Sequence, residues 1–355
     1  MTQVLQILSK INKKLMFLVL GVLLVVAMSS YNLSPTSTKK KSIDYIAYMR
    51  TINKAESYIL KEQFDSALVM YKLAFKNVDK PLAGHSFTAM QTSAYLDEID
   101  VFEDFVIETF KCGLTVKDIT NDSLLNNYIS DKKLYEVIQK KYKRYSKVFK
   151  NKVDKILKDS LYKLSKLDQK WKIYYIDSLS KIDPNNSKKY NITYDSIVSD
   201  IVENKLIPLI KQYGYPGERN IGPAKNGRQA YRYSFGQETA KIILWHYYRL
   251  PKTCSYNDIF FNEVKKGNMP PDQYASIMDF QARHGTDHSC NSEIYNEKTV
   301  TRDTSLFSQI NSRRKKLGLE SLEEKKSKYR RGQGICRKIR KEKKYNYIKL
   351  FYWCG

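Results

Sequence analysis

Glycine and proline are scarce in this chain, and their scarcity limits the folds that it can adopt. The sequence holds 14 glycines and 9 prolines among 355 residues, fewer than an all-β protein needs for its many tight turns. Hydrophobic residues make up 42% of the chain, which is enough to build cores for two ordinary domains. We therefore expect a mainly α fold with only minor extended segments.

An apolar run near the N-terminus indicates export. Leu15–Met28 follows three lysines and precedes Ser29 and Ser30, which is the order of a secretory signal peptide. A helix over this run would span roughly 21 Å, short of the ~30 Å hydrocarbon core of a bilayer. We expect a signal peptide that is cleaved after Ser29. The alternative is an uncleaved anchor formed by residues 15–28, and both place the rest of the chain outside the cytoplasm.

Small and aromatic residues recur at helical spacing in the first part of the exported chain. Ala55 and Tyr58 fall on one helix, and Ala67, Tyr71 and Ala74 recur on the next at i, i+4 and i+7. Such spacing lets two antiparallel helices approach closely while the rings fill the space between them. This part resembles tetratricopeptide-like repeats, and the resemblance implies stacked helical hairpins that bind a protein or peptide partner.

The repeat pattern weakens along the chain. Glu62 stands where the repeat usually has a turn glycine, and the closing proline comes late, at Pro81. A more degenerate second unit covers Phe87–Leu114, and Asp122–Val148 carries the apolar face of a capping region. The alternative is an ordinary helical-hairpin domain without repeat ancestry.

The C-terminal half carries separated signatures. In order they are LDQKWK at 167–172, ENKLIPLIKQYGYPGERNIG at 203–222, ETAKIILWHYYR at 238–249, FFNEVKKGNMPPDQYASIMDFQARHG at 260–285 and INSRRKKLGLESLEE at 310–324. They resemble an uncharacterised bacterial family known only as a domain of unknown function, whose members are exported or lipoprotein-type helical domains. The resemblance covers roughly Leu161–Glu324 and implies no established activity, substrate or cofactor.

His246 and Arg313 are the candidate catalytic residues. His246 follows an apolar run, with Trp245 in place of the glutamine that the resembled family has there. On a largely buried helix its imidazole must bond internally or line a cavity. We expect a structural histidine, bonded to a backbone carbonyl or to a carboxylate such as Asp279. The alternative is an envelope hydrolase or metal-dependent enzyme with a pocket around His246, His284 and Arg313.

A metal site has weaker support. His284 and His288 are spaced i, i+4 with Cys290 close by, which on a helix would place zinc ligands on one face. Gly285 interrupts this spacing, and Thr286–Asn291 replaces the Tyr–Gly–Thr-type motif of the resembled family, so the stretch indicates a loop. No phosphate-binding, dinucleotide-binding or hydrolase motif occurs. We expect neither a metal nor a cofactor.

Several residues have expected local roles. Gly214 is expected to end a helix in the left-handed conformation, and Asp272 to cap the start of a later helix. Asp168 and Gln169 lie late on a helix and are expected to bond a neighbouring element. Alternating aromatic residues at 230–236 predict a short strand or an extended loop.

The cysteines suit an oxidising compartment. Cys112 lies in an apolar helical pattern and is expected to be a buried free thiol. The other four, Cys254, Cys290, Cys336 and Cys354, permit one or two disulfides. The sequence leaves their pairing open.

The net charge of +25 favours anionic partners. For an exported protein these are envelope polymers or lipid headgroups rather than nucleic acid. Basic residues crowd the segment from Lys325 onward, which predicts a solvated tail that attaches to anionic surfaces.

These observations lead to one organisation and one leading function. We expect an exported, non-enzymatic interaction or scaffold protein of the bacterial envelope, located in the periplasm or beyond or anchored in the inner membrane. The alternatives are the enzyme around His246 and a binder of anionic surfaces through the tail. The expected segments are a signal peptide or anchor (1–29), a linker (30–42), a tetratricopeptide-like domain (43–148), an α-rich domain (149–324) and a basic tail (325–355).

The signal peptide is directly testable. We expect the mature protein from the envelope fraction to begin near Ser30, because the apolar run is too short to span a bilayer comfortably. N-terminal sequencing measures this. Intact Met1 in cytosolic protein would contradict both the signal and the anchor.

Overall fold

A computed structural model confirms the mainly α fold. It describes residues 44–224, 237–284, 293–296, 306–342 and 348, which belong to one unit of the chain beginning at Ile43. No β-strand occurs among them, and none of these helices has the length and hydropathy needed to span a bilayer. The apolar run 15–28, the aromatic segment 230–236, His288 and Cys290 lie outside the described residues.

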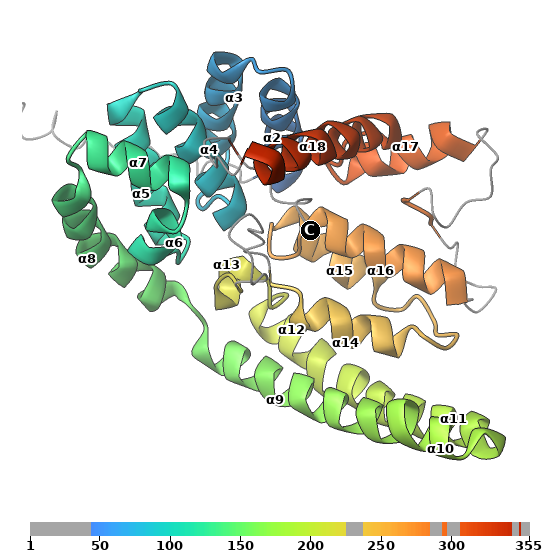
Figure 1. Cartoon of the computed structure of the whole chain (residues 1–355). Coiled ribbons are helices and arrows are strands. Elements are labelled where there is room, and N and C mark those ends of the chain that lie inside the picture. The colour runs from blue at the N-terminus through green and yellow to red at the C-terminus, as the bar shows by residue number, and fades with distance from the viewer. Residues whose placement is uncertain (1–43, 225–236, 285–292, 297–305, 343–347, 349–355) are drawn as a thin grey trace, which may run out of the picture. The chain divides into compact units, whose positions relative to one another are not determined.

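The N-terminal part is built from antiparallel helices (Figure 1). α2 packs against α3, α4 against α5, and α8 against α5. The helices are α2 (Tyr45–Leu60), α3 (Phe64–Lys76), α4 (Ala83–Tyr95), α5 (Ile99–Lys111), α6 (Val116–Thr120), α7 (Ser123–Asp131) and α8 (Tyr135–Lys152).

The same turn joins α2 to α3, α4 to α5, and α7 to α8. Glu62, Asp97 and Lys133 take the left-handed conformation there, with φ of 59°, 59° and 56°. The residue after each donates its backbone N–H to the carbonyl five residues earlier, at 2.9–3.0 Å. The three positions are 35 and 36 residues apart. Asp122–Val148, expected as a capping region, therefore contains a third hairpin with the same turn, and the resemblance to tetratricopeptide repeats stays a prediction.

The small residues lie where the helices approach most closely. Ala55 of α2 and both Ala67 and Ala74 of α3 are fully buried, as is the ring of Tyr71 between them. Their burial explains why α2 and α3 need alanine on the facing surfaces, since a larger side chain would push the helices apart.

The C-terminal half begins after a break between two helices. α8 ends at Lys152, and Asp154 caps the next helix by accepting the Leu157 N–H at 2.8 Å. The elements that follow are α9 (Lys155–Lys172), the π-helical η1 (Ile173–Leu179), α10 (Ser180–Ile182), the 3₁₀ turn η2 (Pro184–Asn186), α11 (Ser187–Ser199), the π-helical η3 (Asp200–Leu206), α12 (Ile207–Tyr213), α13 (Glu218–Ile221), α14 (Thr239–Tyr247), α15 (Asn257–Lys265), α16 (Pro271–His284), α17 (Phe307–Lys316) and α18 (Leu322–Glu342).

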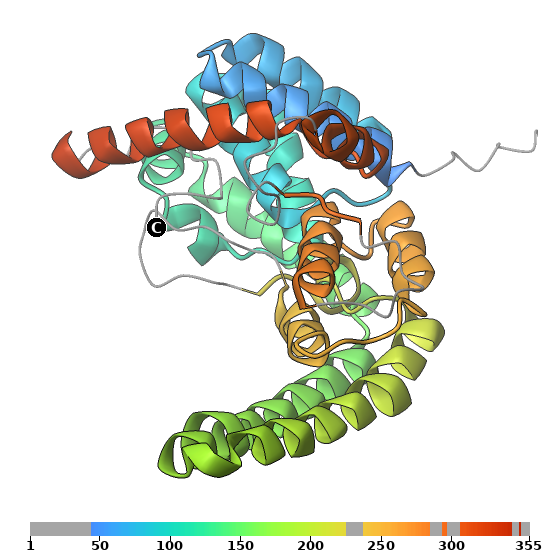
Figure 2. The ribbon, with the colours of Figure 1, turned by 90° about the vertical axis from the view of Figure 1, so that its right-hand side faces the viewer.

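The segment from Lys325, expected as a solvated tail, belongs to the helix α18, in which most of the described basic side chains are exposed. This helix packs against α2, and Figures 1 and 2 show it running alongside the hairpins. Lys328 is only 5% exposed and pairs with the buried Glu56 of α2 at 2.8 Å. The basic residues of 325–342 therefore belong to a docked helix, because one of its lysines finds a buried carboxylate.

Other local expectations have mixed outcomes. Gly214 ends α12 with φ of +83°, as predicted, and Cys112 is a buried free thiol. Asp272 is the second residue of α16 and not its cap. Cys254 and Cys336 are both disulfide-bonded.

The alanine contact gives a stability prediction. We expect Ala67→Trp to lower the free energy of unfolding by about 1–3 kcal/mol or more, because no space exists for an indole between α2 and α3. Thermal or urea unfolding measures this. Val69→Trp on the exposed face of the same helix is the matched control, and equal midpoints for the two variants would contradict the packing.

Candidate functional site

The three residues that the sequence proposed for a pocket, His246, His284 and Arg313, lie on α14, α16 and α17. His246 lies on α14 and bonds Asp168 of α9, with Nδ1 2.8 Å from Oδ2. The carboxylate partner is therefore Asp168 and not Asp279, which accepts the Tyr295 N–H instead. Arg313 is half-buried, and among the described residues it bonds the Ile294 carbonyl at 3.5 Å. Neither His246 nor Arg313 lines either of the two cavities described below.

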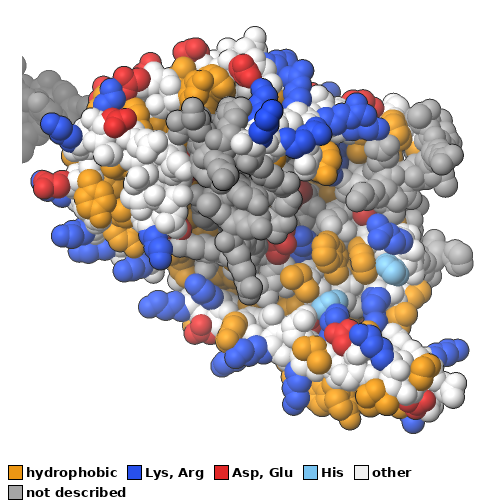
Figure 3. Space-filling view, viewed as in Figure 1, with side chains coloured by type: hydrophobic (Ala, Val, Ile, Leu, Met, Phe, Trp, Pro, Cys, Tyr) orange, Lys and Arg blue, Asp and Glu red, His pale blue; other side chains and the backbone are white. Residues whose placement is uncertain are grey.

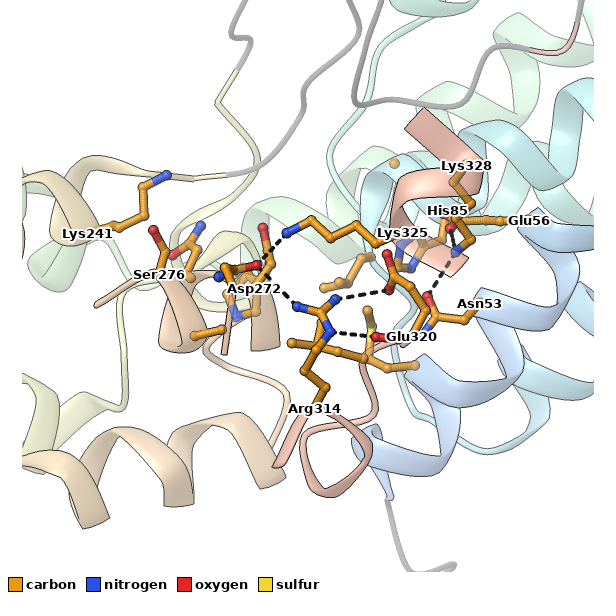
Figure 4. A pocket seen from close by; sticks show the side chains of 18 of the residues that line it. Asn53, Glu56, His85, Lys241, Asp272, Ser276, Arg314, Glu320, Lys325 and Lys328 are labelled. Carbon is orange, nitrogen blue, oxygen red and sulfur yellow. Dashed lines mark hydrogen bonds and ion pairs between the residues drawn. The ribbon is translucent and has the colours of Figure 1, made fainter. Parts of the chain in front are cut away.

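A cavity of about 570 Å³ lies instead between the hairpins and the C-terminal half (Figure 4). Its volume falls in the usual range for small-molecule sites. One wall comes from α2 and α4, the other from α13, α14, α16, α17 and α18. The charged side chains that line it are Glu56, Glu218, Glu238, Lys241, Asp272, Arg314, Glu320, Lys325 and Lys328.

Arg314 forms the rigid part of the wall. Its side chain is almost fully buried, and its Nε donates to the Glu320 carbonyl at 2.6 Å. Nη1 donates to the Tyr295 carbonyl at 2.9 Å and to Asn296 Oδ1 at 3.1 Å. These bonds hold the planar guanidinium in one orientation. Burial lowers the pKa of Arg314 from its usual value, and Glu320 opposes this shift.

Asp272 and Lys325 present opposite charges to the cavity. The cavity leaves both accessible to solvent, yet the surrounding protein raises the pKa of Asp272 by desolvation and lowers that of Lys325 for the same reason. Lys325 donates to Asn296 Oδ1 at 2.5 Å. Among the described residues, no ion pair involves Asp272. The loss of hydration therefore disfavours the charged form of both side chains.

Glu218 is a buried carboxyl group on the same cavity. It accepts the backbone N–H of Ala83, the first residue of α4, at 2.6 Å. Burial raises its pKa to about 7, against the opposing effects of this bond and of Lys80, and the charge of Asp272 adds to the rise. Glu218 therefore joins the two halves and changes protonation near neutral pH.

The remaining polar groups are satisfied within the wall. Lys241 pairs with Glu238 at 2.8 Å. The Tyr48 hydroxyl accepts the Leu82 N–H and lies 2.8 Å from His85 Nδ1. Burial lowers the pKa of His85 to about 4, so its ring is neutral at pH 7 and accepts the Tyr48 hydroxyl proton.

The donor set of the cavity does not suit a metal. No group of three or more His, Cys, Asp or Glu side chains within the described ranges is arranged to hold a metal ion. His284 ends α16 with its ring 4.4 Å from that of Phe280, whereas the other proposed ligands, His288 and Cys290, lie outside those ranges. The cavity instead offers charges of both signs and hydrogen-bond donors.

A second depression, of about 630 Å³, lies on the hairpins among α3, α5 and α8. Its rim carries the Lys111–Glu108 ion pair at 2.7 Å, and both side chains are partly exposed. Figure 3 shows Lys and Arg side chains spread over α8 and α9 and over α17 and α18. These groups are solvated, so the enclosed cavity is the stronger candidate site.

Sequence reasoning missed most of the cavity. It named Arg313, whereas the neighbouring Arg314 turns inward, and it treated Asp272 and Lys325 as a cap and a tail residue. Glu218 and Asp272 both fall within the quoted signatures, but their meeting depends on contacts between distant segments.

Comparison with protein-family models, curated proteins and solved structures finds no match for this chain. The cavity must therefore be interpreted from its own geometry, and the two resemblances stay predictions.

Glu218 gives a pH prediction. Its pKa is higher in the folded chain than the ordinary 4.5, so the folded state holds its proton longer and stability falls as pH rises from about 4.5 to about 7. We expect Glu218→Gln to remove a fall of about 2–3 kcal/mol over this window, while its amide oxygen still accepts the Ala83 N–H. Urea unfolding at several pH values measures this. An unchanged pH profile, matching that of the exposed Glu136→Gln, would contradict the buried proton.

Proposed function

We propose that this chain is an exported binding protein whose cavity holds a small zwitterion, an amino acid or a short peptide with free termini. The observation that carries the proposal is the pair of opposite charges, Asp272 and Lys325, that face one cavity with Arg314 beside them. The carboxylate would accept the ammonium group of the ligand. Lys325 and the guanidinium edge of Arg314 would hold the ligand's carboxylate.

The cost of the arrangement supports a binding role. Desolvation disfavours the charged form of both Asp272 and Lys325, so the empty cavity is less stable than one lined by neutral residues. Sites that keep charges at such a cost are often functional. A ligand that carries both charges would replace the lost hydration of Asp272 and Lys325 with direct hydrogen bonds.

Two features support export. The apolar run Leu15–Met28 follows a basic segment, and the disulfide bonds of Cys254 and Cys336 suit an oxidising compartment. We keep the envelope location as a proposal on these grounds.

The hairpins suit a small ligand better than the protein partner that the sequence predicts. α18 and the α15–α16 loop cover much of α2, so the hairpins offer less free surface for a large partner than a bare repeat array. A small ligand enclosed between the two halves fits this closure better than a folded protein partner.

The test uses peptides that differ only in their terminal charges. We expect tri-alanine with free termini to bind the wild-type protein and raise its melting temperature, by mass action on the folded state. N-acetylated tri-alanine and tri-alanine amide should each bind at least tenfold more weakly, because each loses one charged contact. Calorimetry and thermal shift measure this, with alanine and di-alanine as shorter probes.

Matched variants locate the site. Asp272→Asn and Lys325→Gln should abolish binding, whereas Asp258→Asn and Lys338→Gln should not. Asp258 is also the second residue of its helix, and Lys338 is exposed on α18. Asp272→Asn should melt at the same temperature or higher at pH 7, because its raised pKa means that the charge costs stability. Failure of all three free peptides to bind would refute the proposal.

A further inference from the structure

A second cluster of polar side chains lies outside the cavity, where α9, α11 and α14 meet. Asp168 is fully buried and is the common acceptor. The Tyr194 hydroxyl donates to its Oδ1 at 2.7 Å, and Gln169 Nε2 donates to Oδ2 at 2.9 Å. His246 Nδ1 lies 2.8 Å from the same Oδ2.

These bonds determine the tautomer of His246. Asp168 already accepts from both Tyr194 and Gln169, so the remaining bond calls for a proton on Nδ1 of His246. In the neutral imidazole the lone pair then lies on Nε2. The His246 side chain is 17% exposed, and no described residue bonds to its Nε2. The basic nitrogen is therefore open to water or to a substrate.

Arg249 adds an unsatisfied donor to this cluster. It lies in the turn that follows α14, where its backbone N–H donates to the His246 carbonyl at 3.4 Å. Its guanidinium lies 5.1 Å from the centre of the Tyr194 ring, and that ring is 6.2 Å from the His246 ring. Nη2 of Arg249 is buried and finds no hydrogen-bond acceptor among the described residues. A buried donor without an acceptor is costly, and an anionic group of a ligand would satisfy it.

We propose that His246 and Asp168 form a general-base dyad that hydrolyses carboxylic esters carrying an anionic group, which Arg249 holds. This activity goes beyond the binding function and uses none of the cavity residues. His246 is the catalytic residue, and Asp168 is a positioning residue that keeps the tautomer.

The reaction balances with water as the only co-reactant. His246 Nε2 takes a proton from water as the water oxygen bonds to the ester carbonyl carbon. The tetrahedral intermediate then collapses, and the bond between the carbonyl carbon and the leaving oxygen breaks. The proton on Nε2 passes to that oxygen, which gives a carboxylic acid, an alcohol and the original imidazole.

Two chromogenic esters test the activity, and the release of nitrophenol is followed by absorbance. The probes are 4-nitrophenyl acetate, which is neutral, and mono-4-nitrophenyl succinate, which carries a carboxylate. We expect the wild-type protein to prefer the succinate, and His246→Gln to lower its kcat/KM by 100-fold or more. Glu136→Gln, at an exposed position of α8, should retain the wild-type rate. Arg249→Met should raise KM for the succinate and leave the acetate unchanged.

Each opposite outcome overturns the proposal. A wild-type rate no higher than that of free imidazole at equal concentration would do so, as would a His246→Gln protein with the wild-type rate. If His246→Gln fails to fold, nitrogen NMR of the wild-type histidines remains decisive, because the dyad requires the proton of His246 on Nδ1. The opposite tautomer would exclude a base on Nε2. An equal effect of Arg249→Met on both esters would remove Arg249 from the site.

Discussion

The docking of the C-terminal half onto helix α2 is the contact on which the rest of the structure depends. Gly267 lies directly against the ring of Tyr45, where an added Cβ would come within 2.2 Å of the ring, and Gly318 leaves only 2.7 Å between such a Cβ and the Ile46 carbonyl. Both glycines have positive φ, so a side chain at either would be strained as well as crowded. The buried pair Glu56–Lys328 then holds α18 to the same helix.

The cavity is a consequence of this docking. One wall comes from the hairpins and the other from the C-terminal half, so neither part forms the cavity alone. Glu218 connects the two parts by accepting the Ala83 N–H at the start of α4. Glu56 and Lys328 satisfy each other, because an isolated buried charge would be costly. Within the described part of the chain Asp272 and Lys325 have no such ion pair, and the proposed function assigns these two charges to a ligand.

Two helices of the hairpins, α2 and α4, form one wall of this cavity. The three turns at Glu62, Asp97 and Lys133 repeat one backbone geometry, although no glycine stands at any of them. α18 packs against α2, and the resemblance to tetratricopeptide repeats stays a prediction. The Asp168–His246 cluster lies within the C-terminal half, and neither residue lines the cavity.

The sequence by itself determined the helical class, the close approach at Ala67 and Ala74, the helix stop at Gly214 and the buried thiol of Cys112. Each depends on residues within a turn or two of the chain, because helical periodicity and left-handed stops are local properties. Only the tertiary structure decided that Arg314 rather than Arg313 turns inward, that Asp168 is the partner of His246, and that Lys328 is buried. These outcomes depend on which surfaces meet, and the surfaces come from segments tens to hundreds of residues apart in the chain. Neighbouring residues of a helix point in directions about 100° apart. A local pattern therefore does not show which of two neighbours, such as Arg313 and Arg314, faces the interior.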